Sequence, residues 1–168
     1  TLTNRDKIIT PRTRDALMEA QKAGNIVVLA SGRPTPGVEP LARELEMDRF
    51  GSYILSYNGG MITNCKTGET VFSSLLPLEA NGKIIGLAKE HRVDILTYEG
   101  EEVITNNREC PYAISESNIN HLPLRQVDDM EAYVDFQVPK FIMLDDGDYL
   151  VTVEPKVKAA MGRDFSVY

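Results

Sequence analysis

The stretch Val27-Val28-Leu29-Ala30-Ser31-Gly32-Arg33-Pro34 decides the fold of this chain. Its apolar half predicts a buried strand, and Ser-Gly-Arg then places a hydroxyl and backbone N–H groups at that strand's carboxyl end. Open α/β sheets bind their ligands at the carboxyl ends of strands. A hydroxyl beside an unhindered glycine amide suits an anionic phosphate oxygen, and arginine adds a permanently charged planar group. We therefore predict a phosphate-binding turn made by Ser31, Gly32 and Arg33.

The residues around this stretch alternate between helices and short strands. Thr10-Pro11 predicts the start of a helix and Gly24 its end, because threonine caps helices and proline fits their first turn. The elements expected next are a strand over Asn25–Ala30 covered on both faces, a helix over Val38–Met47, and a buried strand over Tyr53–Ser56. This order with tight loops predicts a doubly wound parallel α/β sheet, whose first strand would precede Thr1.

The chain changes character near Leu76. Before it, residues 61–72 are expected to form a β-hairpin in which Gly68 supplies a positive φ. The elements expected after it are a helix over Leu78–His91, strands over Asp94–Tyr98 and Val103–Thr105, short helical pieces over Tyr112–Ser117 and Asp128–Ala132, a strand over Lys140–Leu144, a helix over Asp148–Met161 and a strand from Phe165 to Tyr168. We therefore predict two domains, residues 1–76 and an α+β lobe over residues 77–168.

Composition and charge exclude several classes of protein. The 168 residues, 42% of them hydrophobic, are typical of a globular chain. A net charge of −7 argues against a nucleic acid partner, which needs clustered Lys and Arg, but leaves room for a small phosphorylated ligand in a local positive pocket. No apolar run reaches the roughly 20 residues that span a bilayer, and no signal peptide precedes the first helix. Cys65 and Cys110 form no disulfide framework, so we expect a cytoplasmic protein.

Several short motifs together resemble the haloacid dehalogenase (HAD) superfamily and, within it, the Cof-type sugar phosphatases. Thr1-Leu2-Thr3 resembles the tail of the opening Asp-x-Asp-Gly-Thr motif, and Ile9-Thr10-Pro11 resembles the start of the helix that follows that motif. Val28–Pro34 resembles the second motif of the superfamily. Ser56-Tyr57-Asn58-Gly59-Gly60 resembles the Asn-Gly turn that comes after it. The second motif and the turn at this separation are moderately specific together, whereas each alone is weak.

The resemblance implies a fold and a reaction. A Rossmann-like core, partly contained in residues 1–76, would carry an inserted α+β cap of the C2 type, partly contained in residues 77–168. Members hydrolyse small phosphorylated metabolites with Mg²⁺ and through an aspartyl-phosphate intermediate. By the resemblance, sugar phosphates are the first substrate class to expect here. Such a transfer needs in-line positioning and electrostatic stabilisation. By the resemblance, Ser31 would bind the phosphoryl group through its hydroxyl and Gly32 through its backbone N–H.

The resemblance also assigns supporting roles and leaves some positions unfilled. Arg33 would orient the substrate or brace the loop, and Asn58 would line the entrance beneath the cap. The two catalytic aspartates are expected just before Thr1, and the later lysine and acidic Mg²⁺ motif beyond Tyr168. We therefore place no metal ligand among these residues and expect the 168-residue chain alone to be catalytically inactive.

Two other functions stay open on the sequence. One is a non-catalytic Rossmann-like module that binds a phosphorylated ligand or a partner without converting it. The other is a phosphomutase-like member of the same superfamily, which would need an activating bisphosphate.

The acidic run Asp145-Asp146-Gly147-Asp148 is expected to be a solvated turn, with Asp148 capping a helix.

Overall fold

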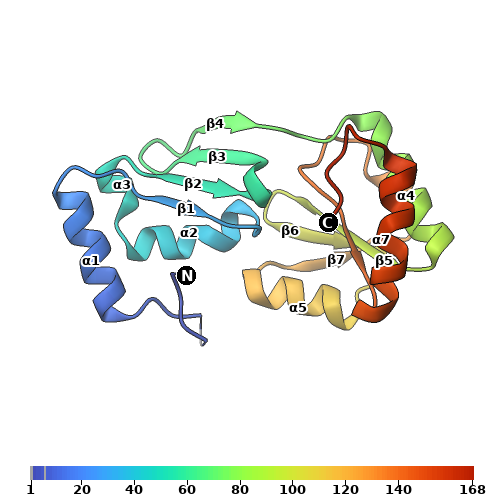
Figure 1. The fold of residues 1–168 in the computed structure, drawn as a ribbon, viewed down its shortest axis with the longest axis horizontal. Coiled ribbons are helices and arrows are strands. Elements are labelled where there is room, and N and C mark those ends of the chain that lie inside the picture. Colours follow the sequence, from blue (N-terminus) through green and yellow to red (C-terminus); the bar gives the residue numbers. More distant parts are fainter. Residues whose placement is uncertain (1, 6) are drawn as a thin grey trace. The chain divides into compact units, whose positions relative to one another are not determined.

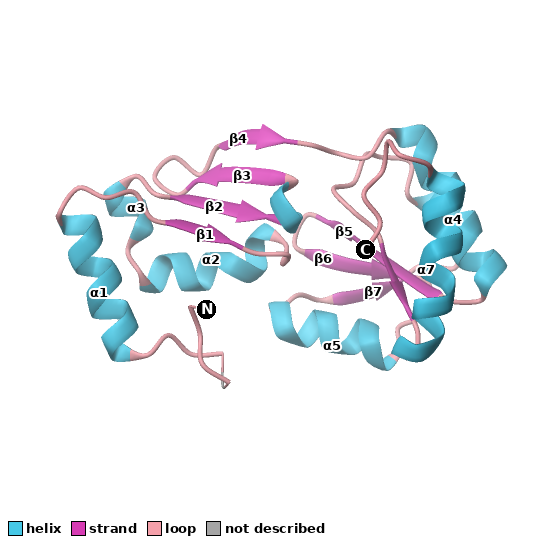
Figure 2. Cartoon of the chain, viewed as in Figure 1, coloured by secondary structure: helices cyan, strands magenta, loops and turns pink. Residues whose placement is uncertain are grey.

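The computed structural model of this chain describes residues 2–5 and 7–168. The chain divides into two compact units, Thr1–Ser74 and Leu75–Tyr168. Each unit has its own sheet (Figures 1 and 2), four-stranded in both cases. Each also has its own cluster of buried apolar residues. Thr1, which begins the motif predicted at the start of the chain, lies outside the described residues.

The first unit contains a parallel strand pair joined by a helical connection. Its elements are α1 (Pro11–Lys22), β1 (Val28–Ala30), α2 (Thr35–Glu44), α3 (Met47–Phe50), β2 (Tyr53–Ser56), the 3-10 turn η1 (Tyr57–Gly59), β3 (Met61–Asn64) and β4 (Thr70–Ser73). The strand order is β1-β2-β3-β4, with β1 parallel to β2 and the other two pairs antiparallel (Figure 1). The predicted α/β class is confirmed by this arrangement, as is the predicted hairpin, in which Gly68 has a φ of 73°.

The core of the first unit lies between its sheet and the helices that connect β1 to β2. The cluster consists of Ile9, Leu29, Val38, Ala42, Leu45, Met47 and Ile54. One buried amide adds a polar link: Gln21 of α1 donates from Nε2 to the carbonyl of Leu45 at 2.8 Å and accepts from the hydroxyl of Ser52 at 3.0 Å. Because both ends of this amide are hydrogen-bonded, its burial carries little penalty.

The strand β1 differs from the prediction in length and in coverage. It spans Val28–Ala30 and not the whole of Asn25–Ala30, and its burial alternates along the strand. Leu29 is 8% exposed and joins the core, whereas Val28 is 50% exposed. Among the described residues, one face of this strand is buried and the other is exposed, whereas the sequence pattern predicted cover on both faces.

The helix after the Ser-Gly-Arg turn begins earlier and ends earlier than predicted. α2 starts at Thr35, because Pro36 in its first turn is already set for a helical φ. It ends at Glu44, and the short helix α3 follows as a separate element. The break comes at Glu46, whose φ of 50° is left-handed and interrupts the helical backbone.

The second unit is an α+β arrangement around a mixed sheet. Its elements are α4 (Leu78–His91), β5 (Asp94–Glu99), β6 (Glu102–Thr105), α5 (Pro111–Asn120), β7 (Leu124–Gln126), α6 (Met130–Tyr133), β8 (Ile142–Leu144) and α7 (Gly147–Met161). The strand order is β7-β6-β5-β8, with β6 parallel to β7 and the other pairs antiparallel. Figure 2 labels β5, β6 and β7 of this sheet. The sequence gives no sign of β7, because Leu-Arg-Gln lacks the apolar alternation that marks a strand.

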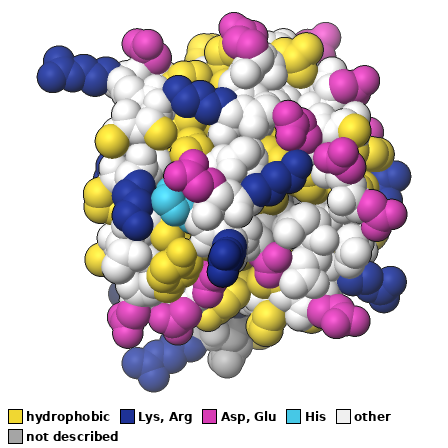
Figure 3. Space-filling view, turned by 90° about the vertical axis from the view of Figure 1, so that its right-hand side faces the viewer, with side chains coloured by type: hydrophobic (Ala, Val, Ile, Leu, Met, Phe, Trp, Pro, Cys, Tyr) yellow, Lys and Arg dark blue, Asp and Glu magenta, His cyan; other side chains and the backbone are white. Residues whose placement is uncertain are grey.

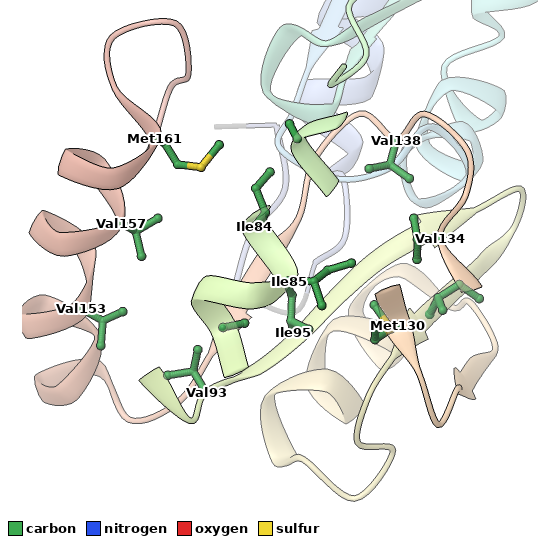
Figure 4. Packing of buried hydrophobic residues seen from close by; sticks show 13 residues of the cluster. Ile84, Ile85, Val93, Ile95, Met130, Val134, Val138, Val153, Val157 and Met161 are labelled. Atoms are coloured by element: carbon green, nitrogen blue, oxygen red, sulfur yellow. The ribbon is translucent and has the colours of Figure 1, made fainter. Parts of the chain in front are cut away.

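The sheet of the second unit is covered on both faces. Ile95 and Ile104 lie in the large cluster with α4, α6 and α7. Figure 4 shows Val153, Val157 and Met161 along one side of α7, facing α4. On the other face, the phenol of Tyr98 donates to Glu116 of α5 at 2.7 Å. The strands β5 and β6 are therefore interior strands of this unit.

The last residues of the chain differ from the prediction. Phe165–Tyr168 does not form a strand. Phe165 and Val167 instead pack against the apolar cluster of the second unit. Their alternating apolar pattern is therefore explained by side-chain packing without a hydrogen-bonded strand partner.

Charge is mixed on the face of the molecule nearest α4 and α7. Figure 3 shows Lys and Arg side chains there separated from one another by acidic, apolar and uncharged ones.

Among the residues that the structure describes, no helix is long and apolar enough to cross a membrane.

Candidate functional site

The turn after β1 is built on the end of the parallel strand pair. The N–H of Ser31 donates to the carbonyl of Leu55 in β2 at 2.8 Å, which extends the parallel pairing one step beyond β1. The hydroxyl oxygen of Ser31 accepts from the N–H of Arg33 at 3.1 Å. This bond turns the chain away from the strand. The hydroxyl proton of Ser31 is not used in this bond and can donate to an anion.

The segment after β2 runs beside this turn. The N–H of Tyr57 donates to the carbonyl of Arg33 at 2.9 Å, and the N–H of Asn58 donates to the carbonyl of Ser31 at 3.1 Å. The structure therefore brings together all four residues that the sequence singled out, Ser31, Gly32, Arg33 and Asn58, at the carboxyl ends of β1 and β2.

Asn58 lies directly over Gly32. A Cβ atom built on Gly32 would lie 3.1 Å from the amide nitrogen of Asn58 and 3.2 Å from its amide oxygen. Both distances are tighter than ordinary contacts, so the absence of a side chain at Gly32 is what permits this approach. Asn58 is exposed, so the outer side of its amide faces solvent beside the turn.

Three further residues that sequence reasoning missed hold the turn in place. The hydroxyls of Thr35 and Ser56 are 2.7 Å apart and hydrogen-bonded, and Ser56 is completely buried. The phenol of Tyr57 is hydrogen-bonded to the backbone of Thr35. Burial raises the pKa of the Tyr57 phenol, and this backbone bond partly opposes the increase. The only sequence signal for Ser56 and Tyr57 is their position next to the Asn-Gly pair.

Arg33 is turned toward the helix that follows it. Its Nη1 donates to the carbonyl of Gly37 in α2 at 3.4 Å, and its side chain is half-buried. Of the two roles that the resemblance implies for Arg33, bracing the loop is the one that this contact serves directly.

The described residues form no metal site, either at this turn or elsewhere. No group of three or more His, Cys, Asp or Glu side chains among residues 2–5 and 7–168 is arranged to hold a metal ion. In the acidic run before α7, Asp146 is the cap and accepts from the N–H of Asp148 at 3.0 Å. The prediction that Asp148 caps this helix is therefore wrong, because the cap lies two residues earlier.

A second polar cluster lies at one end of the sheet of the second unit. Arg125 forms ion pairs with Glu99 at 2.5 Å and with Glu102 at 3.2 Å. Tyr133 donates to Glu99 at 2.6 Å, and this bond raises the pKa of the Tyr133 phenol. The cluster links β5, β6, β7 and α6, and its single guanidinium is already paired with two carboxylates, so it offers no free cation to an anionic ligand.

The two thiols are poor nucleophiles in this fold. Burial raises the pKa of Cys65, and the nearby carboxylates of Asp48 and Glu39 raise it further. Burial also raises the pKa of Cys110, although N–H groups of α5 partly oppose this. Because the thiolate is the reactive form, neither residue is a candidate for nucleophilic catalysis.

Curated proteins with similar sequences are named as phosphatases. The chain is 30% identical over 156 residues to "Putative phosphatase YxeH" of Bacillus subtilis, covering 91% of this chain and 57% of that protein. It is 29% identical over 153 residues to a protein of Streptococcus pyogenes serotype M6 that is also named a "Putative phosphatase", covering 89% of this chain and 56% of that protein. The chain therefore spans a little over half the length of these relatives.

Solved structures share the fold. A haloacid dehalogenase-like hydrolase from Bacteroides thetaiotaomicron is 39% identical and superposes with a TM-score of 0.86, over 94% of this chain and 59% of that one. A HAD subclass IIB sugar phosphatase is 18% identical and has a TM-score of 0.69, over 92% of this chain and 59% of that one. The second likeness supports the α/β fold alone.

A family model describes the whole length of the chain. The model of the haloacid dehalogenase-like hydrolases matches residues 1–168. This match agrees with the fold and with the motifs that the structure places at the carboxyl ends of β1 and β2. The chain belongs to the haloacid dehalogenase-like hydrolase family.

Proposed function

We propose that the protein carrying this chain is an Mg²⁺-dependent phosphatase of small phosphorylated metabolites, with sugar phosphates as the first substrate class to test. In this proposal Ser31 and Gly32 bind the phosphoryl group. The observation that carries the proposal is the turn at the end of β1, where a serine hydroxyl and a glycine backbone lie together beside an exposed amide. Family membership and the phosphatase names of two curated relatives support the same activity.

Each residue of the turn has a distinct task in this proposal. Ser31 donates its hydroxyl proton to a phosphoryl oxygen, because its oxygen already accepts from Arg33. Gly32 would contact the phosphoryl group through its backbone, at a position where an added Cβ would lie 3.1 Å from the amide nitrogen of Asn58. The N-terminus of α2 follows within a few residues, and its partial positive charge favours an anion here. Together these groups stabilise negative charge that moves onto the phosphoryl oxygens during transfer.

The described residues do not supply the metal ligands or the nucleophile of this reaction. They hold no carboxylate cluster that fits Mg²⁺, so none of them is assigned to the ion. We expect two aspartates before Thr1 to supply this chemistry. One carboxylate would form an O–P bond as the bond from phosphorus to the sugar oxygen breaks; the other would give that oxygen its proton and then take a proton from the water that hydrolyses the aspartyl-phosphate. The 168-residue chain alone is accordingly expected to be inactive.

The second unit is proposed to be the cap of the enzyme. Its sheet carries helices on both faces and its core is separate from that of the first unit, as expected for an inserted lobe. The solved sugar phosphatase shares this fold, and we extend its substrate class to this protein as part of the proposal. A cap that closes over a sugar excludes water and adds contacts to the sugar.

The test is Ser31→Ala in the intact protein, with Ser73→Ala on the exposed strand β4 as the matched loss of a hydroxyl. Initial rates are measured over a panel of sugar phosphates with Mg²⁺. Ser31→Ala is expected to lower kcat/KM by about 100-fold, the usual cost of one donor to transition-state charge, while Ser73→Ala leaves it unchanged. An unchanged rate in Ser31→Ala would show that this serine does not contact the phosphoryl group. Turnover that requires an added bisphosphate would instead indicate a phosphomutase.

A further inference from the structure

The segment Ser56–Asn58 contacts the turn after β1 along most of its length. Asn58 contacts Ser31 through its backbone and Gly32 through its amide. Tyr57 contacts Arg33, and Ser56 contacts Thr35. The turn is therefore shaped from outside, by a segment that follows a neighbouring strand. We call Ser56–Asn58 the clasp.

The backbone of the clasp is unusual at Tyr57. The φ angles of Tyr57, Asn58 and Gly59 are 50°, 59° and 94°, so three successive residues are left-handed. Glycine adopts this region freely and asparagine tolerates it, but an aromatic residue rarely does. Such a conformation persists only where the surroundings enforce it, and it is common at functional sites.

Two hydrogen bonds enforce this conformation of Tyr57 from opposite ends of the residue. Its backbone N–H donates to the carbonyl of Arg33 at 2.9 Å. Its phenol is hydrogen-bonded to the backbone of Thr35, the first residue of α2, and the residue is only 8% exposed. Pro34 precedes the helix and supplies no side-chain cap, and the phenol of Tyr57 meets the backbone at this uncapped end of α2.

We propose that Tyr57 is a positioning residue that fixes the geometry of the phosphate-binding turn by linking the Arg33 carbonyl to the start of α2. This inference rests on the proposed function of Ser31 and Gly32. With residues 33 and 35 both held by Tyr57, the path of the chain through Pro34 is fixed. The orientation of the Ser31 hydroxyl, which is set by its bond to the Arg33 N–H, is fixed with it.

The experiment compares Tyr57→Phe with Tyr53→Phe, which removes a phenol from the other end of β2. Tyr57→Phe keeps the ring in the core and removes only the oxygen that meets the backbone of Thr35. The backbone amide NMR shifts of Ser31, Gly32 and Thr35 are recorded in the intact protein without phosphate and during a titration with inorganic phosphate. Steady-state kinetics with a sugar phosphate are measured at the same temperature, where all variants are fully folded.

We expect Tyr57→Phe to shift the three amides in phosphate-free buffer. The Kd for inorganic phosphate and the KM should each rise about three- to tenfold, as for one lost hydrogen bond, while kcat stays within about twofold. A residue that acted only on stability would lower the melting temperature and leave Kd and KM unchanged. Tyr53→Phe should leave all of these quantities unchanged.

Two results would overturn different parts of this inference. Unmoved amides in Tyr57→Phe, with unchanged affinity for phosphate, would show that Tyr57 does not set the geometry of the turn. A wild-type protein whose Gly32 amide ignores inorganic phosphate would contradict the proposed function of the turn. In that case the shifts measured without phosphate still decide whether Tyr57 shapes it.

Discussion

The sheets of the two units differ in how completely their faces are covered. In the first unit, β1 alternates between exposed and buried residues, and β4 is exposed at every position. In the second unit, four successive residues of β5 are buried, and so are three of β6. The apolar cluster of the second unit is also the larger of the two.

The two units also differ in the interactions that shape the parts described here. The proposed phosphate-binding turn extends β1, and hydrogen bonds from the clasp give the turn its shape. The second unit, in contrast, depends on apolar burial for its shape. The comparison predicts that substitutions in the two units will fail in different ways.

The largest expected effect on stability comes from creating a cavity in the apolar core of each unit in turn. Ile85→Ala in α4 and Ile54→Ala in β2 each remove a side chain that is at most 2% exposed. Each should cost about 2–5 kcal/mol in the free energy of unfolding, because the cavity adds to the lost apolar burial. Hydrogen exchange read by mass spectrometry should then speed up in residues 75–168 for Ile85→Ala and in residues 2–74 for Ile54→Ala. Equal acceleration throughout would mean that the units unfold together.

A smaller effect is expected from adding one methyl group in each unit. Gly32→Ala pushes a Cβ against the amide of Asn58, whereas nothing lies within 4 Å of a Cβ on Gly86 in α4. Gly32→Ala should lower the free energy of unfolding by about 1 kcal/mol, because the added Cβ crowds Asn58. Gly86→Ala should raise the free energy of unfolding by up to about 1 kcal/mol, because alanine is the better helix former. Midpoints of urea unfolding measure both changes. A stabilising Gly32→Ala would show that Asn58 moves aside freely.

The smallest expected effect is a pH dependence in the second unit. Burial lowers the pKa of Lys140 from its ordinary value of 10.5, and the charge of Glu116 partly opposes this shift. Between the lowered pKa and 10.5 the unfolded chain binds more protons than the folded one, so the free energy of unfolding should rise with pH. Lys140→Met should remove this rise, with the exposed Lys89→Met as control. A rise that persists in Lys140→Met would assign it to another group.

Local sequence signals predicted most of the elements correctly. Thr10, Pro11 and Gly24 mark both ends of α1, since capping and positive φ are properties of single residues. The helix α4 has the predicted bounds of Leu78 and His91 for a similar reason: its apolar spacing lies within one element. Such signals need no knowledge of what the element packs against.

Features that depend on distant partners could not be predicted in this way. The strand β7 is polar and exists because β6 lies beside it, with Val103 opposite Leu124. The role of Tyr57 depends on two bonds to residues before β2, and no pattern in the sequence links position 57 to position 33. The residues that would bind phosphate were predicted from a motif, whereas those that hold them in place become visible only in the fold.

The pairing of β5 with β8 has a consequence for the newly made chain. Asp94 lies opposite Leu144, so one edge of β5 is completed only when a strand about 50 residues later has been synthesised. Because the chain is synthesised at about 5–20 residues per second, the apolar edge around Ile95 and Leu96 stays unpaired for several seconds during translation. During that interval it is a template for pairing with other chains. Faster translation between these two strands should therefore shorten the interval in which this edge can pair with another chain.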